Sequence, residues 1–238
     1  MKKTLTALAI SSALLANTAI ADNKHWKTYH VKVTNTTAHH VITPPTVVAH
    51  NGRYKMFEVT QPASEEVATM AETGNPGPLS MAASEDGNVY SVEVGMSLNE
   101  ETGMMEPTVI PPGHSLVVTI EAPRRAFFTV AGMLATTNDA FMASVNIKAP
   151  RVHRYAYGHG MTYDAGSEMN NESCDYIPGP PCNNGVNMRA NGVDPETGMM
   201  MNEGFVTIHN GVHGVGDLMP KHLDWRGPTA MISIHNDG

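Results

Sequence analysis

Apolar and polar residues alternate over several short segments of this chain, which is the pattern of β-strands that bury one face. In the first segment Tyr29, Val31 and Val33 share one side and the polar residues between them share the other. About eight such strands without intervening helices predict an all-β fold, an antiparallel β-sandwich rather than βαβ units. The other seven predicted strands are Met56–Val59, Val89–Val94, Leu116–Ile120, Ala126–Leu134, Phe141–Ile147, Phe205–Ile208 and Ala230–Ile234.

One short helix is expected after residue 64. Ser64 is a suitable N-cap, and the two glutamates that follow it favour the positive end of a helix. Val67, Met70 and Ala71 then form an apolar stripe, which predicts packing against the core, and Gly74 is a suitable C-terminal stop.

The segment from Tyr155 to Asn202 shows no strand pattern and is rich in glycine, asparagine, proline and acidic residues. We expect a long irregular segment here, and such segments in compact domains tend to be functional. No Pro/Ser-rich linker divides the chain, so we expect a single domain.

The N-terminus has the pattern of an export signal. Lys2 and Lys3 precede a short apolar run, and Ala19 and Ala21 supply the small residues at −3 and −1 of a signal-peptidase site. Residues 1–21 are therefore predicted to be removed, leaving a domain over residues 22–238. The apolar run is too short to cross a bilayer, and no later stretch is apolar enough. We expect a periplasmic or secreted protein without a transmembrane segment.

The net charge of the chain limits the classes of partner that it is expected to bind. The chain has 15 Lys+Arg and 23 Asp+Glu, a formal charge of −8, which becomes −10 when Lys2 and Lys3 leave with the signal. A chain of this net charge is not expected to bind nucleic acid nonspecifically, or anionic lipid by charge alone.

The two cysteines, Cys174 and Cys182, flank the turn-forming segment Asp-Tyr-Ile-Pro-Gly-Pro-Pro. An oxidising compartment favours a disulfide between them, which would close a short loop. The alternative, a thiolate metal site, lacks a Cys-x-x-Cys pair.

Three acidic residues suggest a cation site. Asp164 and Glu168 lie on either side of Gly166, where the backbone can turn sharply, and Asp139 comes just before a predicted strand. Hard oxygen donors on such edges suit Ca²⁺, which accepts six to eight oxygens in irregular geometry. On composition alone, acids that simply form turns are the stronger explanation.

The order of several motifs favours the cation site over acids that simply form turns. The sequence contains Asn138-Asp-Ala-Phe141, then Tyr163-Asp-Ala-Gly-Ser-Glu168, then the final strand Pro228-Thr-Ala-Met-Ile-Ser-Ile234. In this order, from about Tyr29 to Ile234, they resemble the spondin N-terminal domain family. Its bacterial branch is indicated by Thr43-Pro-Pro45, Phe57–Ser64, Cys174 to Cys182 and Gly204–Asp217.

The resemblance implies an eight-stranded antiparallel sandwich similar to C2 domains, with a divalent cation, usually calcium, at one edge. The family's ligand positions fall on Asp139, Asp164 and Glu168. Animal relatives are matrix and adhesion proteins. This chain departs from the family at Glu168, where aspartate is usual, at Ala140, where animal members have an aromatic residue, and in having no thrombospondin repeat.

Two other metal chemistries remain as alternatives. Exposed methionines in Glu101–Met105 and Glu196–Met201, assisted by His39-His40, are soft ligands that suit copper, although methionine also fills packing gaps. His209 and His213 have the spacing of a helical zinc motif, but Asn210-Gly211 between them would break a helix.

No catalytic motif is present: there is no Gly-x-Ser-x-Gly elbow and no phosphate-binding glycine-rich loop. The sequence therefore predicts an exported calcium-binding β-sandwich module, not an enzyme, with an unknown protein or glycan as its partner. The alternatives are a periplasmic copper-handling protein and a metal-dependent hydrolase.

Overall fold

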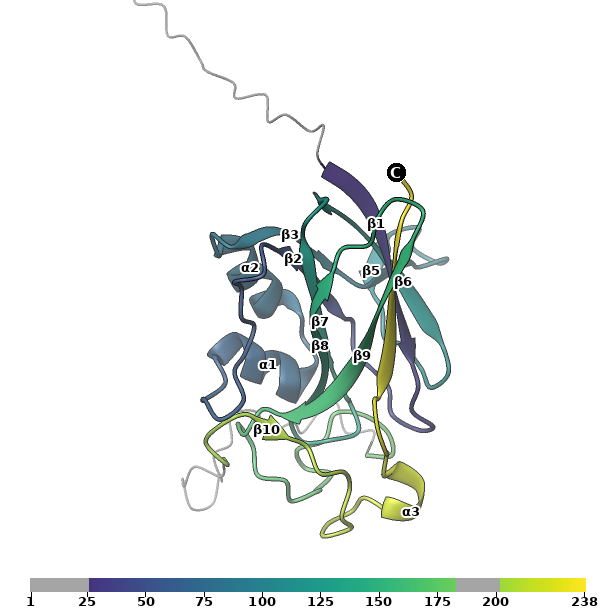
Figure 1. Cartoon of the computed structure of the whole chain (residues 1–238). Helices are drawn as coiled ribbons and strands as arrows, with labels where there is room; N and C mark the ends of the chain where they lie inside the picture. Colours follow the sequence, from purple (N-terminus) through teal and green to yellow (C-terminus); the bar gives the residue numbers. More distant parts are fainter. Residues whose placement is uncertain (1–25, 183–201) are drawn as a thin grey trace, which may run out of the picture.

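Eight antiparallel strands are hydrogen-bonded in one continuous path, in the order β3-β2-β7-β8-β9-β11-β1-β6 (Figure 1). The computed structural model describes residues 26–182 and 202–238, so the predicted signal at residues 1–21 lies outside it. The predicted all-β class is confirmed. The strands of the path are β1 (Trp26–Asn35), β2 (Thr46–His50), β3 (Val89–Val94), β6 (Ser115–Pro123), β7 (Phe127–Met133), β8 (Ala140–Lys148), β9 (Tyr155–Asp164) and β11 (Ala230–Asn236).

The path folds over on itself because β9 changes partner along its length. Residues 155–160 pair with β11, whereas residues 161–164 pair with β8. The two halves of the path thereby face each other across the core, where the Tyr29 ring of β1 meets the Phe128 ring of β7 at 5.0 Å between centroids. At the far ends of the path, Ser91 Oγ of β3 donates to the Glu121 carbonyl of β6 at 2.5 Å, so the sheet is nearly closed.

Two glycines allow this corner. A side chain at Gly158 would collide with Ile147 and Ser144 of β8, and one at Gly160 would collide with Met142 and Ala230. These glycines also interrupt the apolar alternation of β9, and for this reason the sequence predicted an irregular segment from Tyr155 onward. That prediction was wrong for the first ten residues of the segment, which form a strand.

Six of the predicted strands coincide with β1, β3, β6, β7, β8 and β11. The predicted strand Phe205–Ile208 is reduced to the two residues of β10 (Thr207–Ile208), which pairs with the end of β9. Met56–Val59 is not a strand: it is a loop that packs the Phe57 ring against Phe141 at 5.0 Å between centroids. We also missed β2, because all five of its residues are buried and no alternation marks it.

A short hairpin, β4 (Met96–Leu98) with β5 (Met105–Pro107), stands apart from the main sheet.

The expected helix is α1 (Glu65–Thr73), and its ends are as predicted. Ser64 Oγ accepts the Val67 N–H at 3.3 Å, and the N–H of Gly74, at φ 70°, donates to the Met70 carbonyl at 3.0 Å.

We expected one helix, but a second of equal length, α2 (Gly77–Glu85), follows it. Gly77-Pro78 reads as a helix breaker in the sequence, yet proline in the first turn of a helix is favourable because its missing N–H needs no partner there. Both helices lie against the outer side of β2, β7 and β8 (Figure 1). A four-residue helix, α3 (Pro220–Leu223), lies at the lower end of the molecule in the same view.

Apolar side chains form two main clusters. One fills the space between the facing halves of the sheet, and the other lies between the sheet and the two helices, where Val67, Met70 and Ala71 are buried as predicted. No helix among the described residues is long and apolar enough to cross a membrane.

The β9 corner yields a stability prediction. Gly158→Ala should lower the free energy of unfolding by about 1–3 kcal/mol, because its methyl group would force β9 away from β8. Gly87→Ala is the matched control, since a Cβ there meets nothing within 4 Å. Urea unfolding of both variants measures the difference, and equal stability of the two would refute this account of the corner.

Candidate metal centre

The three predicted ligands lie at one end of the β8–β9 pair. Asp139 immediately precedes β8, Asp164 is the last residue of β9, and Ala140 lies opposite Asp164 in the ladder. The Asp139 carbonyl also accepts the Ala165 N–H at 3.2 Å. The structure therefore brings the acid at residue 139 and the bend at residues 164–168 together, as their order in the sequence led us to expect.

The bend depends on glycine. Gly166 has φ 67°, and a side chain there would collide with the Phe205 backbone. The Gly166 N–H donates to Asp164 Oδ1 at 2.7 Å, which tightens the turn. As a result, the backbone N–H groups of Ser167 and Glu168 point at Asp139 Oδ2 and donate to it at 2.8 and 3.0 Å.

Two carboxylate oxygens remain without a partner. Asp139, Asp164 and Glu168, which we call the acidic cluster, are only 0, 3 and 3% exposed. Asp139 Oδ1 and Glu168 Oε2 are fully buried and have no hydrogen-bond partner among the described residues. Within that part of the chain, no salt bridge neutralises the cluster either. Leaving ionised oxygens buried without a counter-charge is costly, so such atoms indicate a missing proton or cation.

Burial and mutual repulsion change the acidity of the cluster. Burial, reinforced by the negative charge of Asp164, raises the pKa of Asp139 to about 7. Burial, followed by the charges of Glu72 and Asp139, raises the pKa of Glu168 to about 9. The pKa of Asp164 is also raised by burial. Each carboxyl is thus held in surroundings that disfavour its charged form.

The acidic side chains alone do not form a complete ligand set. Among the described residues, no group of three or more His, Cys, Asp or Glu is placed to hold a metal ion. The fit to a cation therefore rests on the unpartnered oxygens of Asp139 and Glu168, since both Asp164 oxygens already accept bonds from Gly166 and Asn170. Further ligands from the described residues would be backbone or amide oxygens, with water completing the shell.

Several residues near the cluster were not predicted. Asn170 donates to Asp164 Oδ2, and Glu72 of α1 is 6% exposed and close enough to raise the pKa of Glu168. Glu172 is also buried, and its carboxylate accepts the N–H groups of Gly214 and Val215 at 2.7 and 2.9 Å. No local motif marks these residues, because tertiary packing creates their surroundings.

A pocket of about 220 Å³ lies beside the cluster, and its lining includes Asp164, Asn170, His209 and His213. His209 does not have the surroundings of a zinc ligand. Its Nδ1 accepts the Gly211 N–H at 3.0 Å, and its ring packs against Trp225 at 5.0 Å between centroids. Residues 209–213 form a loop rather than the helix that the zinc motif requires. Burial, assisted by His213, lowers the pKa of His209 to about 4.

The predicted disulfide is confirmed: Cys174 and Cys182 are bonded, with their Cα atoms 5.0 Å apart. Ile177, in the loop that they close, is buried in a small cluster with Val212 and Leu218. The Cys174 N–H donates to Asp217 Oδ2 at 2.8 Å. The bridge and its cluster thereby attach residues 174–182 to the loop at 212–218, beside the acidic cluster.

Only some of the predicted copper ligands lie in the described part of the chain. Met104 and Met105 are 61 and 55% exposed on the β4–β5 hairpin, and Met199–Met201 lie outside the described residues. His39 is exposed, but His40 is buried and its Nε2 contacts the Leu223 carbonyl at 2.5 Å. The two adjacent histidines are therefore not available to one ion.

No protein-family model matches this chain, and no curated protein matches it at a significant level. The resemblance to the spondin N-terminal domain family stays a prediction, and the function has to be inferred from the geometry described above.

The burial of His209 predicts a pH dependence of stability. Its pKa is about 6.5 in the unfolded chain and about 4 in the fold, so only the unfolded chain takes up this proton as the pH falls between those values. This histidine should therefore lower the free energy of unfolding by up to about 1.4 kcal/mol per pH unit in that window.

His209→Phe should remove that part of the acid sensitivity, whereas His159→Gln, at an exposed position, should not. Urea unfolding from pH 7 to pH 4 compares the three proteins. Parallel curves for the wild type and His209→Phe would show that the folded chain takes up this proton as readily as the unfolded chain, which would refute the lowered pKa.

Proposed function

We propose that this chain is an exported calcium-binding β-sheet domain that acts as a binding or adhesion-type module. In it, Ca²⁺ neutralises the acidic cluster of Asp139, Asp164 and Glu168. The observation that carries the proposal is the pair of buried, unpartnered oxygens, Asp139 Oδ1 and Glu168 Oε2. Three carboxylates around a divalent ion leave one net negative charge, and the ion would supply the attraction that the cluster lacks.

The donor chemistry favours calcium over the other common ions. The cluster contains only carboxylates, without the thiolate or imidazole groups that zinc and copper prefer. Calcium accepts backbone and amide oxygens and water in irregular geometry, whereas Mg²⁺ requires a near-ideal octahedron. In this proposal Asp139 and Glu168 supply direct ligands, and Asp164 supplies charge and the turn that holds the bend.

Two further observations support the wider proposal. The disulfide between Cys174 and Cys182 is of the kind found in oxidising compartments, in agreement with the export signal. The resemblance to spondin domains, carried by the motifs around Asp139 and Asp164, suggests a module that binds a protein or glycan partner.

Calcium should raise the melting temperature of the purified mature protein. An excess of about a hundredfold over Kd contributes about 2.7 kcal/mol, which corresponds to a rise of roughly 5–10 °C.

Asp139→Asn should have opposite effects on the calcium-free and the calcium-bound protein. Without calcium it removes a repulsive charge from the cluster, whereas with calcium it removes a ligand of the ion. We expect it to melt higher than the wild type in EDTA and lower in excess Ca²⁺.

Glu121→Gln is the matched control, since it removes one negative charge at an exposed position on β6. It should leave the calcium response unchanged. A wild-type melting temperature that is the same in EDTA and in Ca²⁺ would refute the proposed site.

Copper binding is a second candidate function, favoured by one groove. His39 lies between β1 and β2 in the chain, and His222 and Met219 lie in and just before α3. All three side chains line a groove of about 560 Å³. The two histidine rings are 6.4 Å apart between centroids, and Met219 is 60% exposed. Two imidazoles and a thioether suit both oxidation states of copper.

Copper titration of the mature protein tests this groove. His222→Gln combined with Met219→Leu should weaken binding of Cu(II) and Cu(I), whereas Met104→Leu with Met105→Leu, on the separate hairpin, should not. Equal losses in the two double variants would contradict a site at the groove.

A further inference from the structure

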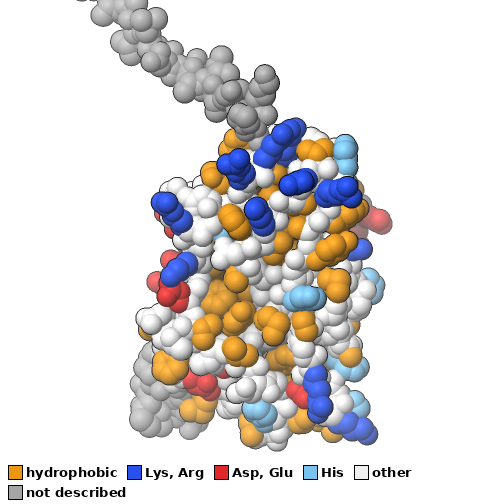
Figure 2. Space-filling view, in the orientation of Figure 1, with side chains coloured by type: hydrophobic (Ala, Val, Ile, Leu, Met, Phe, Trp, Pro, Cys, Tyr) orange, Lys and Arg blue, Asp and Glu red, His pale blue; other side chains and the backbone are white. Residues whose placement is uncertain are grey.

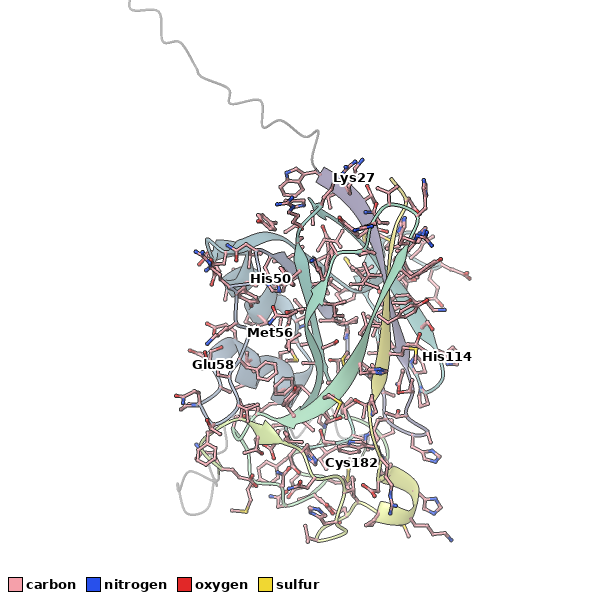
Figure 3. The ribbon with its side chains drawn as sticks, in the orientation of Figure 1. Lys27, His50, Met56, Glu58, His114 and Cys182 are labelled. Atoms are coloured by element: carbon pink, nitrogen blue, oxygen red, sulfur yellow. A yellow bond between two sulfur atoms is a disulfide. The ribbon has the colours of Figure 1, made fainter. Side chains whose placement is uncertain are left out.

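Basic residues gather at the end of the molecule farthest from the acidic cluster. The ladders place the end of β8 beside the start of β7, with Lys148 opposite Phe127, whereas Asp164 lies opposite Ala140 at the other end of β8. Lys and Arg side chains gather at this upper end in Figure 2, and Figure 3 labels Lys27 there, with Cys182 at the lower end. We call this surface the basic end; it consists of Lys27, Arg124, Arg125, Lys148, Arg151 and Arg154.

The basic end makes no ion pair with the described part of the chain. All of its residues except the half-buried Lys27 are exposed. Within residues 26–182 and 202–238, none of the six makes a salt bridge or a side-chain hydrogen bond. The nearby Asp237 carboxylate is already paired with His30 and His235, at 2.6 and 2.7 Å.

The turns that carry these charges are held in place. The Ala149 N–H donates to the Ala126 carbonyl at 2.9 Å, which joins the β8–β9 turn to the β6–β7 turn. The buried Asn236 of β11 makes two hydrogen bonds to the β8–β9 turn. Its side-chain Nδ2 donates to the Pro150 carbonyl at 3.1 Å, and its backbone carbonyl accepts the His153 N–H at 2.8 Å. A ligand that binds here would therefore pay little entropy for ordering the loops.

Aromatic side chains continue the surface from the basic end along β9. Tyr155 and Tyr157 are 58 and 66% exposed, and their rings are stacked at 6.2 Å between centroids. The Tyr155 ring also stacks on His235 of β11, at 4.4 Å between centroids. More than half of the surface of each tyrosine is therefore open to a ligand.

We propose that the basic end and the Tyr155–Tyr157 row form a binding site for an acidic polysaccharide. Carboxylate or sulfate groups of the polysaccharide would pair with the arginines, and its sugar rings and hydroxyl groups would contact the tyrosines. The formal charge of −8 averages over the two ends and does not describe the local field at the site. This site lies away from the acidic cluster and does not depend on bound calcium.

Other anionic partners fit this surface less well. The turns at residues 123–126 and 149–154 carry no exposed large hydrophobic side chain, which a loop that docks on a membrane would insert. Nucleic-acid bases stack on aromatic faces, and the Tyr155 ring already stacks on both Tyr157 and His235.

Binding to chondroitin sulfate, with neutral dextran as the comparison, tests the proposal on the purified mature protein. We expect saturable binding to chondroitin sulfate alone, weakening as NaCl rises from about 0.05 M to about 0.3 M. Changing Arg124, Arg151 and Arg154 together to serine should weaken it by roughly 10- to 100-fold at low salt. Tyr155→Ser with Tyr157→Ser should weaken it without reducing its salt dependence.

The control changes Lys32, Lys221 and Arg226 to serine, which removes the same charge from exposed positions elsewhere. It should retain affinity, as should a variant with lysine at positions 124, 151 and 154. Melting curves check that every variant is folded. Equal losses in the two serine triples, or tighter binding to phosphatidylglycerol vesicles or to duplex DNA than to chondroitin sulfate, would overturn the proposal.

Discussion

Repulsion among buried carboxylates is the constraint on which the lower end of this structure depends. The ladder between β8 and β9 places Asp139 next to the bend at residues 164–168, and the sheet core and α1 then exclude water from it. Among the described residues, backbone N–H groups stabilise only one of the two Asp139 oxygens. The surrounding loops, including the one held by Glu172, therefore enclose carboxyl groups for which that part of the chain supplies no cationic partner.

The corner in β9 determines how this end is built. A strand that pairs with two neighbours in succession joins the two halves of the sheet and ends at the acidic cluster. Its glycines are needed because Ile147 and Met142 leave no room for side chains. The same strand begins at the basic end, so one ten-residue element connects the two surfaces.

The sequence was informative where structure is locally encoded. Strands with one buried face, the capped helix α1 and the disulfide were all predictable, because alternation, capping residues and short cysteine spacing are local signals. Strand β2 was not, since it is buried on both faces, and β9 was hidden by the glycines that form its corner. Helix α2 was missed because a proline that starts a helix resembles one that ends it.

The candidate site follows the same division. The meeting of Asp139 with the bend could be predicted from motif order, but the contributions of Glu72, Asn170 and Glu172 could not, because those residues converge only in the folded chain. The basic end was also invisible in the sequence, where its residues are spread over turns far apart and are outweighed by acidic residues elsewhere.

The distance between the acidic cluster and the basic end has a consequence for binding. At about 3.3 Å per residue, β9 spans roughly 30 Å, several times the screening length of physiological salt. Ligands bound at its two ends would be too far apart to touch, and salt would screen the charge of each from the other. A calcium ion at the acidic cluster and an anionic ligand at the basic end would therefore bind independently of each other.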